Sequence, residues 1–288
     1  MKNIKSIFLK LKSKLKVIIE NFYKLSFLEK PLPNNPFGNK ILASKDTYSR
    51  LHFEAISTND ELVCKFEKKY GFSLDLKWWR ELALHTQVVI KPEKLNFFHG
   101  RLLYSVLSKY IDDIDDIETS KKHINIFETG TARGFSSICM SKALIEMNCS
   151  GVITTVDSIP HNKKIFWNCI DDHQGPKSRA NLLKPWAEEL ERIVFIQGWT
   201  KNIINRLGLQ RINFAFLDAQ HTKDDVLSEF CYVKDRQLSG DIIVFDDVTE
   251  GLFEGVCDAI KIVERNYPYS IERINFSDNR GYAIAIRD

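Results

Sequence analysis

The stretch that most constrains the fold is residues 124–134, which read I-N-I-F-E-T-G-T-A-R-G. An apolar run ends in an acid, two glycines frame a turn, and a segment with helical periodicity follows. This order predicts a β-strand, a tight turn and a helix whose N-terminal amides face whatever binds above the turn. Gly130 can adopt the positive φ that the turn needs, and Gly134 allows the start of the helix to pack closely.

The glycine spacing argues against a phosphate-binding turn. The motif E-x-G-x-x-x-G has Ala132 and Phe135 where dinucleotide-binding proteins have glycines, and it lacks the G-K-[ST] ending of a P-loop. Glu128 precedes the first glycine and would repel a pyrophosphate. The turn instead suits a ligand whose near end is cationic, such as an amino-acid ammonium or a sulfonium.

Composition describes a soluble globular protein of 288 residues, with 44% hydrophobic and 27% charged residues. This length accommodates one α/β domain with an added helical part. The net charge of +3 is concentrated near the start, where eight lysines and two acids fall within the first thirty residues. The remainder is close to neutral, so we expect no nucleic-acid binding. The six cysteines form no C-x-x-C pair, which predicts buried reduced thiols in a cytosolic protein rather than disulfides or zinc ligands.

The N-terminal arm, residues 1–30, has apolar residues at spacings of three and four with lysines on the opposite side, which predicts a basic amphipathic helix. No apolar run is long enough to span a bilayer, and a signal peptide is not predicted. Two interpretations stay open: a helix packed on its own protein or a homodimer partner, or one lying peripherally on the inner, anionic face of the membrane. We divide the chain into an arm and linker (1–40), a helical cap (41–122) and an α/β domain (123–288).

The cap is predicted to contain helices at residues 61–70, 76–84 and 94–111. The pair Trp78 and Trp79 belongs either to the core or to a lid over the substrate, and we expect His85 and His99 to be structural.

The α/β part has apolar runs that alternate with helical segments. They predict five strands followed by a two-stranded hairpin: 124–128, 152–156, 193–197, 212–217, 241–245, 271–276 and 282–286. This alternation predicts a three-layer sheet with an antiparallel last strand and a ligand outside the strand carboxyl ends. Asp157 ends the second strand, where an acid either binds ribose hydroxyls or caps a helix. Residues 158–186 show no clear periodicity, and we expect them to determine acceptor specificity.

Five motifs occur in a characteristic order: F-E-T-G-T-A-R-G-F-S-S, V-D-S-I-P-H, F-I-Q-G-W-T, F-L-D-A-Q-H and V-F-D-D-V. With them, residues 95–288 resemble the class I S-adenosylmethionine-dependent methyltransferases, and most closely their small-molecule O-methyltransferase branch, which includes sugar and macrolide methyltransferases. The resemblance implies a seven-stranded Rossmann-like sheet. It also implies methyl transfer to a hydroxyl of a sugar, glycan or related small molecule, as in polysaccharide biosynthesis.

The resemblance assigns a cofactor site to the strand ends and the turns that follow them. The methionine end of S-adenosylmethionine would meet the glycine turn, an acid would hold the ribose, and the turn after the third strand would border the adenine. The residues implied are Glu128, Gly130, Thr131, Gly134, Ser136, Asp157, Ser158, Gly198, Trp199, Thr200 and Asp218.

Metal-dependent members of this family carry acids after the fourth and fifth strands, and Asp218, Asp246 and Asp247 match those positions. Carboxylates at neighbouring strand ends repel one another unless a cation or protons neutralise them. An all-oxygen acidic cluster suits Mg²⁺, which would orient the acceptor hydroxyl and lower its pKa.

One departure concerns the catalytic base. Related sugar methyltransferases often have D-x-D or D-G-D-H after the fourth strand, whereas residues 218–221 read D-A-Q-H. Gln220 cannot accept a proton, so His221 becomes the candidate base beside Asp218, or else a residue that orients Asp218.

Three alternatives remain: metal-independent methylation of a secondary metabolite, an NAD-dependent oxidoreductase on a similar sheet, and a non-catalytic membrane-associated module.

Overall fold

The structure is a computed structural model that describes residues 35–57, 61–92, 94–115, 123–276 and 280–288. The expectations for the basic arm, including its contacts with a membrane or a dimer partner, fall outside these residues. Asn34–Asp288 form one compact unit.

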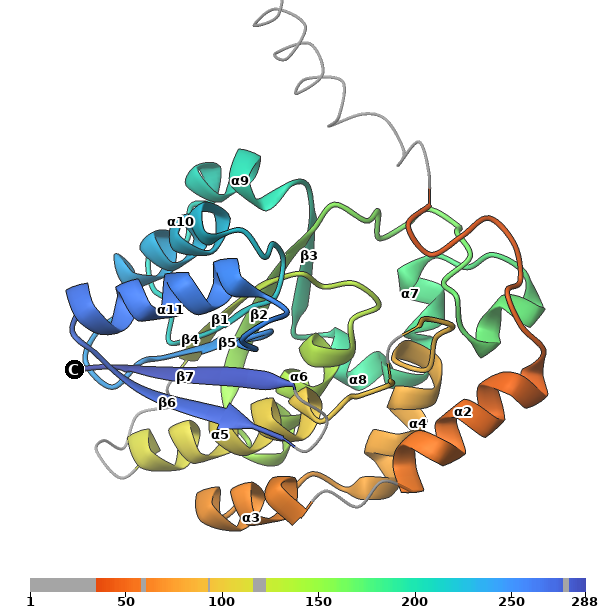
Figure 1. The fold of residues 1–288 in the computed structure, drawn as a ribbon, viewed down its shortest axis with the longest axis horizontal. Helices are drawn as coiled ribbons and strands as arrows, with labels where there is room; N and C mark the ends of the chain where they lie inside the picture. The colour runs from red at the N-terminus through yellow and green to blue at the C-terminus, as the bar shows by residue number, and fades with distance from the viewer. Residues whose placement is uncertain (1–34, 58–60, 93, 116–122, 277–279) are drawn as a thin grey trace, which may run out of the picture. The chain divides into compact units, whose positions relative to one another are not determined.

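Seven strands form one sheet in the described residues, in the order β3-β2-β1-β4-β5-β7-β6 (Figure 1). The first five are parallel, and β7 runs antiparallel to both β5 and β6. The predicted three-layer sheet with an antiparallel last strand is therefore confirmed. The strands are β1 (His123–Thr129), β2 (Ser150–Asp157), β3 (Ile193–Gln197), β4 (Phe214–Leu217), β5 (Ile242–Phe245), β6 (Tyr269–Asn275) and β7 (Gly281–Arg287).

Helices cover both faces of the sheet, as Figure 1 shows. On one face lie α5 (His99–Asp115), α6 (Phe135–Glu146) and α8 (Ala187–Leu190); on the other lie α9 (Thr200–Ile203), α10 (Lys223–Lys234) and α11 (Glu254–Asn266). Neighbouring strand residues divide between the two resulting cores, because side chains alternate along a strand. Ile126 and Phe216 pack toward α5 and α6, whereas Phe127 packs toward α10 and α11.

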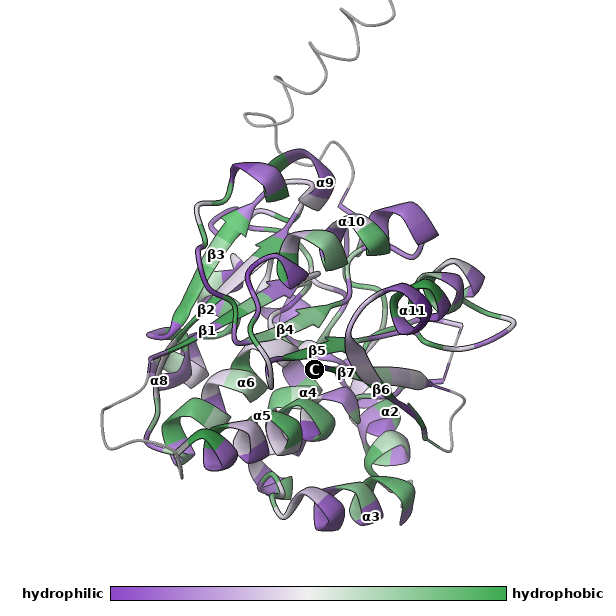
Figure 2. Cartoon of the chain, turned by 90° about the vertical axis from the view of Figure 1, so that its left-hand side faces the viewer, coloured by the Kyte–Doolittle hydropathy of each residue, from purple (hydrophilic) through white to green (hydrophobic). Residues whose placement is uncertain are grey.

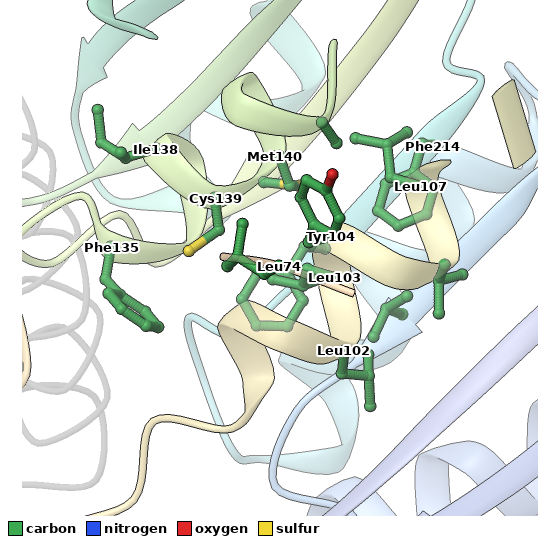
Figure 3. Close-up of a cluster of buried hydrophobic side chains, with 14 of the residues drawn as sticks. Leu74, Leu102, Leu103, Tyr104, Leu107, Phe135, Ile138, Cys139, Met140 and Phe214 are labelled. Carbon is green, nitrogen blue, oxygen red and sulfur yellow. The ribbon is translucent and has the colours of Figure 1, made fainter. Parts of the chain in front are cut away.

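The colours of Figure 2 follow this arrangement, with hydrophobic strands lying between helices that also carry hydrophilic residues. In Figure 3, Leu103 and Leu107 of α5 meet Cys139 and Met140 of α6 in the larger core cluster.

The region predicted as a helical cap, residues 41–122, contains α2 (Lys45–Ser57), α3 (Glu61–Tyr70) and α4 (Leu76–Thr86) as well as α5. The helix predicted at 94–111 runs instead from His99 to Asp115, because the Asn96 side chain accepts the Phe98 amide at 2.7 Å and Phe98 lies in a turn. Trp79 is buried in the core and its indole donates to the Phe97 carbonyl at 3.3 Å. Burial lowers the pKa of His99 to about 3, so this histidine is neutral, and its ring packs on Phe135 and Phe216.

Residues 158–186 form short helical pieces rather than a long element: η1 (Ile170–Gln174), α7 (Arg179–Leu182) and η2 (Lys184–Trp186). The fully buried Trp167 anchors the segment, and its indole donates to the Lys177 carbonyl at 2.8 Å. Arg133, in the turn after β1, donates from Nε to the Trp167 carbonyl at 2.7 Å. His85 of α4 bonds to Asp171 at 2.5 Å, so it joins the cap to this segment.

All six cysteines are free thiols, as predicted, although only Cys139, Cys169 and Cys257 are buried and Cys64 is exposed. Among the helices of the described residues, none has the length and apolar character to cross a bilayer.

Candidate functional site

The glycine turn brings the ends of three strands together. Gly130 has φ +89°, as the turn requires, and its amide donates to the Val156 carbonyl of β2 at 3.0 Å. A Cβ atom at Gly130 would lie only 1.9 Å from the Asp218 carbonyl oxygen, just after β4. The absence of a side chain at this position therefore lets the turn after β1 contact the segment after β4.

Gly134 also has a positive φ, of +94°, and a Cβ atom there would lie 2.7 Å from Leu183. The start of α6 therefore packs closely against the 158–186 segment.

Glu128 lies beneath the turn with no exposed surface. It accepts hydrogen bonds from the hydroxyls of Ser136 and Ser137 at the start of α6, while burial raises the pKa of its carboxyl. Thr131 similarly pairs with the Thr155 hydroxyl of β2. These contacts brace the turn from below, and direct contact of Glu128, Thr131 and Ser136 with a cofactor stays a prediction.

Asp157, at the end of β2, also holds the turn. Its Oδ2 accepts the Ala132 amide at 2.6 Å and its Oδ1 accepts the Ile159 amide at 2.7 Å. The Asp157 carbonyl accepts the Gly198 amide at 2.7 Å, which joins the end of β3 to the same edge. Ser158 and Trp199 are half-buried, and Thr200, the first residue of α9, is buried.

A second group follows β4 and β5. One ligand atom each from Asp218, His221 and Asp247 lies within 4.8 Å of the other two. His221 Nε2 is 2.9 Å from Asp247 Oδ2, and the His221 ring packs on Phe253 with centroids 4.8 Å apart. The hydrogen bond with Asp247 raises the pKa of His221.

Asp246 lies beside this group and is not one of its three members. Its Oδ1 accepts the Asp247 amide at 2.7 Å, and burial together with the Asp247 charge raises its pKa. Burial and the charges of Asp246 and Asp247 likewise raise the pKa of Asp218 well above its ordinary value.

Arg280 immediately precedes β7, and its guanidinium balances part of the negative charge of these carboxylates. Its Nη1 is 3.1 Å from Asp247 Oδ1 and 3.8 Å from Asp246 Oδ2. The sequence analysis assigned no functional role to Arg280, because this residue belongs to none of the five motifs. No separate role was predicted for Arg179, which lies in the segment without periodicity; it is buried, and its Nη2 is 3.9 Å from Asp157 Oδ2.

Glu229 of α10 provides a test of these buried electrostatics. It is 3% exposed and accepts the Thr129 hydroxyl at 2.8 Å. Burial raises its pKa from the ordinary 4.5 to about 7. Between these pH values the unfolded chain releases the proton and the folded chain keeps it, so this group makes stability fall as pH rises. The shift corresponds to a loss of about 3 kcal/mol.

We therefore expect Glu229→Gln, whose amide oxygen can still accept the Thr129 hydroxyl, to be more stable than the wild type at pH 8 but not at pH 4.5. Urea unfolding at both pH values measures this difference. Glu188→Gln, at an exposed acid, is the control and should not alter the pH dependence. A wild-type pH profile retained in Glu229→Gln would contradict the assignment.

Comparisons with known proteins agree with the fold. A family model for a methyltransferase domain matches residues 127–248. A search of curated proteins found no significant match.

Two solved structures illustrate the similarity. The O-methyltransferase TomG from Streptomyces achromogenes, involved in tomaymycin synthesis and solved with S-adenosylmethionine, is 16% identical; the alignment covers 75% of this chain and 91% of TomG, with a TM-score of 0.50. An O-methyltransferase from Bacillus cereus, solved with S-adenosylhomocysteine, is 14% identical, with 85% and 100% covered and a TM-score of 0.50.

At identities this low, the structural similarity supports the fold alone. The family match covers the segment that contains the glycine turn and the acids at the strand ends. The chain therefore contains a methyltransferase domain, carried on the seven-stranded sheet.

Proposed function

We propose that this protein is a class I S-adenosylmethionine-dependent methyltransferase. It would transfer the methyl group from the sulfur of S-adenosylmethionine to a hydroxyl oxygen of a sugar, glycan or related small molecule, with the assistance of a divalent metal ion. The observation that carries the proposal is the group Asp218, His221 and Asp247 at the carboxyl edge of the sheet. The same Asp218 backbone contacts the glycine turn, so the candidate metal and cofactor sites are adjacent.

The charges at this edge fit a divalent cation. When ionised, the three carboxylates of Asp218, Asp246 and Asp247 exceed the single charge of Arg280 by two, and burial makes this excess unfavourable. Carboxylate oxygens with one imidazole nitrogen suit Mg²⁺ or Mn²⁺. A divalent ion at this position supplies Lewis acidity that lowers the pKa of an acceptor hydroxyl.

The residues of this group are held before any ligand binds. The Asp218 amide donates to the Thr129 carbonyl at 3.1 Å, and Asp247 holds one nitrogen of His221 while Phe253 packs on its ring. This geometry favours His221 as the third metal ligand, with Asp246 fixing the Asp247 backbone. Alternatively, His221 is the base that takes the proton of the acceptor hydroxyl. The Mn²⁺ affinity and kcat of His221→Gln distinguish the two roles.

The oxygen acceptor is supported by TomG and the Bacillus cereus enzyme, both of which are O-methyltransferases. The sugar or glycan class rests on the motif resemblance. If the basic arm of residues 1–30 binds anionic lipid, the acceptor would be reached at a membrane surface.

The test is turnover of a panel of sugar nucleotides and glycosides, measured as S-adenosylhomocysteine release with and without EDTA. We expect EDTA to reduce turnover by about a hundredfold or more and excess Mg²⁺ or Mn²⁺ to restore it, because Lewis acidity contributes several kcal/mol to such reactions. Dialysed protein without EDTA, assayed in parallel, controls for chelator effects. Full turnover in EDTA would favour metal-independent methylation instead.

A further inference from the structure

Arg179, the first residue of α7, is a buried arginine that contacts the turn after β1. Its residue surface is 1% exposed, and its Nε donates to the Ala132 carbonyl at 2.9 Å. Its Nη2 lies 3.9 Å from Asp157 Oδ2. One side chain from the unpatterned segment therefore reaches both the glycine turn and the acid at the end of β2.

Ala132 is held from two sides. Its amide donates to Asp157 and its carbonyl accepts from Arg179. Ala132 has φ +45°, in the left-handed region that costs a residue with a Cβ roughly 1 kcal/mol or more. The two hydrogen bonds oppose relaxation of this conformation, so the turn depends on both partners.

Burial makes the position of Arg179 energetically unfavourable for a charged guanidinium. Burial lowers the pKa of Arg179, and the carboxylates of Asp157 and Glu128 offset part of that effect. The guanidinium also lies over the rings of Trp167 and Phe195, at 5.7 and 5.6 Å from their centroids. Within the described part of the chain its Nη2 has no hydrogen-bond partner. The buried guanidinium of Arg179 therefore has an unmade hydrogen bond. Packing alone does not explain why an arginine occupies this position.

We propose that Arg179 is a positioning residue for the cofactor, which keeps the Ala132 turn and the Asp157 carboxylate in the arrangement that receives the ribose and the adjoining methionine end. The proposal rests on the cofactor role proposed for Gly130 and Asp157. Arg179 itself needs no contact with the cofactor, because its effect passes through Ala132 and Asp157.

The experiment compares Arg179→Gln and Arg179→Lys with the wild type in three measurements: the Kd of S-adenosylhomocysteine by calorimetry, KM for S-adenosylmethionine against kcat, and hydrogen–deuterium exchange of residues 129–135. The loss of a hydrogen bond to a charged donor should raise the Kd and the KM roughly tenfold or more. We expect kcat to change by less than about threefold, because bound cofactor restores the turn, and exchange in the turn to accelerate. Arg179→Lys keeps the charge but lacks the guanidinium fork, so it should show the same direction of change.

Arg101→Lys is the matched control. Arg101 is another buried arginine, paired through two hydrogen bonds with Glu67 in the cap helices. Its replacement should lower stability without changing the S-adenosylhomocysteine Kd or exchange in the turn.

Wild-type affinity with unchanged exchange in Arg179→Gln would overturn the proposal; if that variant does not fold, the same result in Arg179→Lys would do so. A wild type that binds no S-adenosylhomocysteine would instead show that the cofactor assignment is wrong, and the exchange data alone would then decide whether Arg179 holds the turn.

Discussion

Gly130→Ala is expected to be among the most damaging single substitutions in the α/β domain. Two effects combine at this position: the backbone has φ +89°, and the new Cβ would lie 1.9 Å from the Asp218 carbonyl oxygen. Positive φ costs a non-glycine residue roughly 1–2 kcal/mol. The overlap involves backbone rather than a movable side chain, so the turn and the segment after β4 must separate. We expect a total loss of about 4 kcal/mol or more in the free energy of unfolding, in the range of the severest core substitutions.

The chain offers a matched control for each effect. Gly175 has the same φ of +89° but nothing within 4 Å of its added Cβ, so Gly175→Ala isolates the conformational cost. Gly208→Ala changes a glycine without a positive φ and also with nothing within 4 Å, and it should be close to neutral. Urea unfolding of the three variants measures the series.

Equal losses in Gly130→Ala and Gly175→Ala would mean that the turn and the segment after β4 do not contact each other as described. If Gly130→Ala folds well enough to assay, its affinity for S-adenosylhomocysteine should also fall, because the same separation displaces the turn from Asp157.

The five parallel strands were predictable because each contains a short apolar run that ends at a polar residue or a turn. β3 was predicted with its observed ends, and β1 extends the predicted run by one residue at either end. The start of α5 was misplaced because apolar spacing continues through Leu95 and Phe98, and periodicity alone cannot detect that Asn96 caps a turn.

The 158–186 segment could not be predicted because its conformation depends on partners distant in sequence. Trp167 is held by Lys177 and Arg133, and Asp171 by His85 of α4. No local pattern of hydrophobicity encodes such contacts. The contacts of Arg179 and Arg280 could not be predicted for the same reason, because their partners belong to other strands and turns.

Where β4 and β5 end, parallel strand order was enough to bring Asp218 near Asp247. It was not enough to decide between Asp246 and Asp247, because consecutive residues at a strand end point in different directions. The positive φ of Asp247, +57°, marks where the chain leaves β5 and turns this carboxylate toward His221. Asp246, one residue earlier and equally buried, uses its Oδ1 to accept the Asp247 amide instead.

Asp247→Asn should abolish metal-dependent turnover while leaving the fold intact. Asparagine tolerates the left-handed conformation of Asp247 better than alanine does, so this substitution removes charge with little backbone strain. It removes a carboxylate from the proposed metal-ligand group and weakens the contact that orients His221. Because a ligand and its orienting contact are both lost, we expect metal affinity and kcat each to fall by about a hundredfold or more. Thermal stability without metal should be unchanged or higher, since Asp246 loses a like-charged neighbour.

Asp246→Asn is the matched control, because it removes the same charge one residue earlier and its amide oxygen can still accept the Asp247 amide. Its metal affinity, measured by titration with Mn²⁺, should stay within a few-fold of the wild type. Equal losses in the two variants would restore Asp246 to the ligand set and contradict the geometry described here. His221→Gln completes the series: reduced Mn²⁺ affinity identifies His221 as a ligand, whereas unchanged affinity with a large fall in kcat identifies it as the base. His123→Gln is the control, because His123 begins β1 and lies at the amino end of the strand, away from this group. It should alter neither the Mn²⁺ affinity nor kcat.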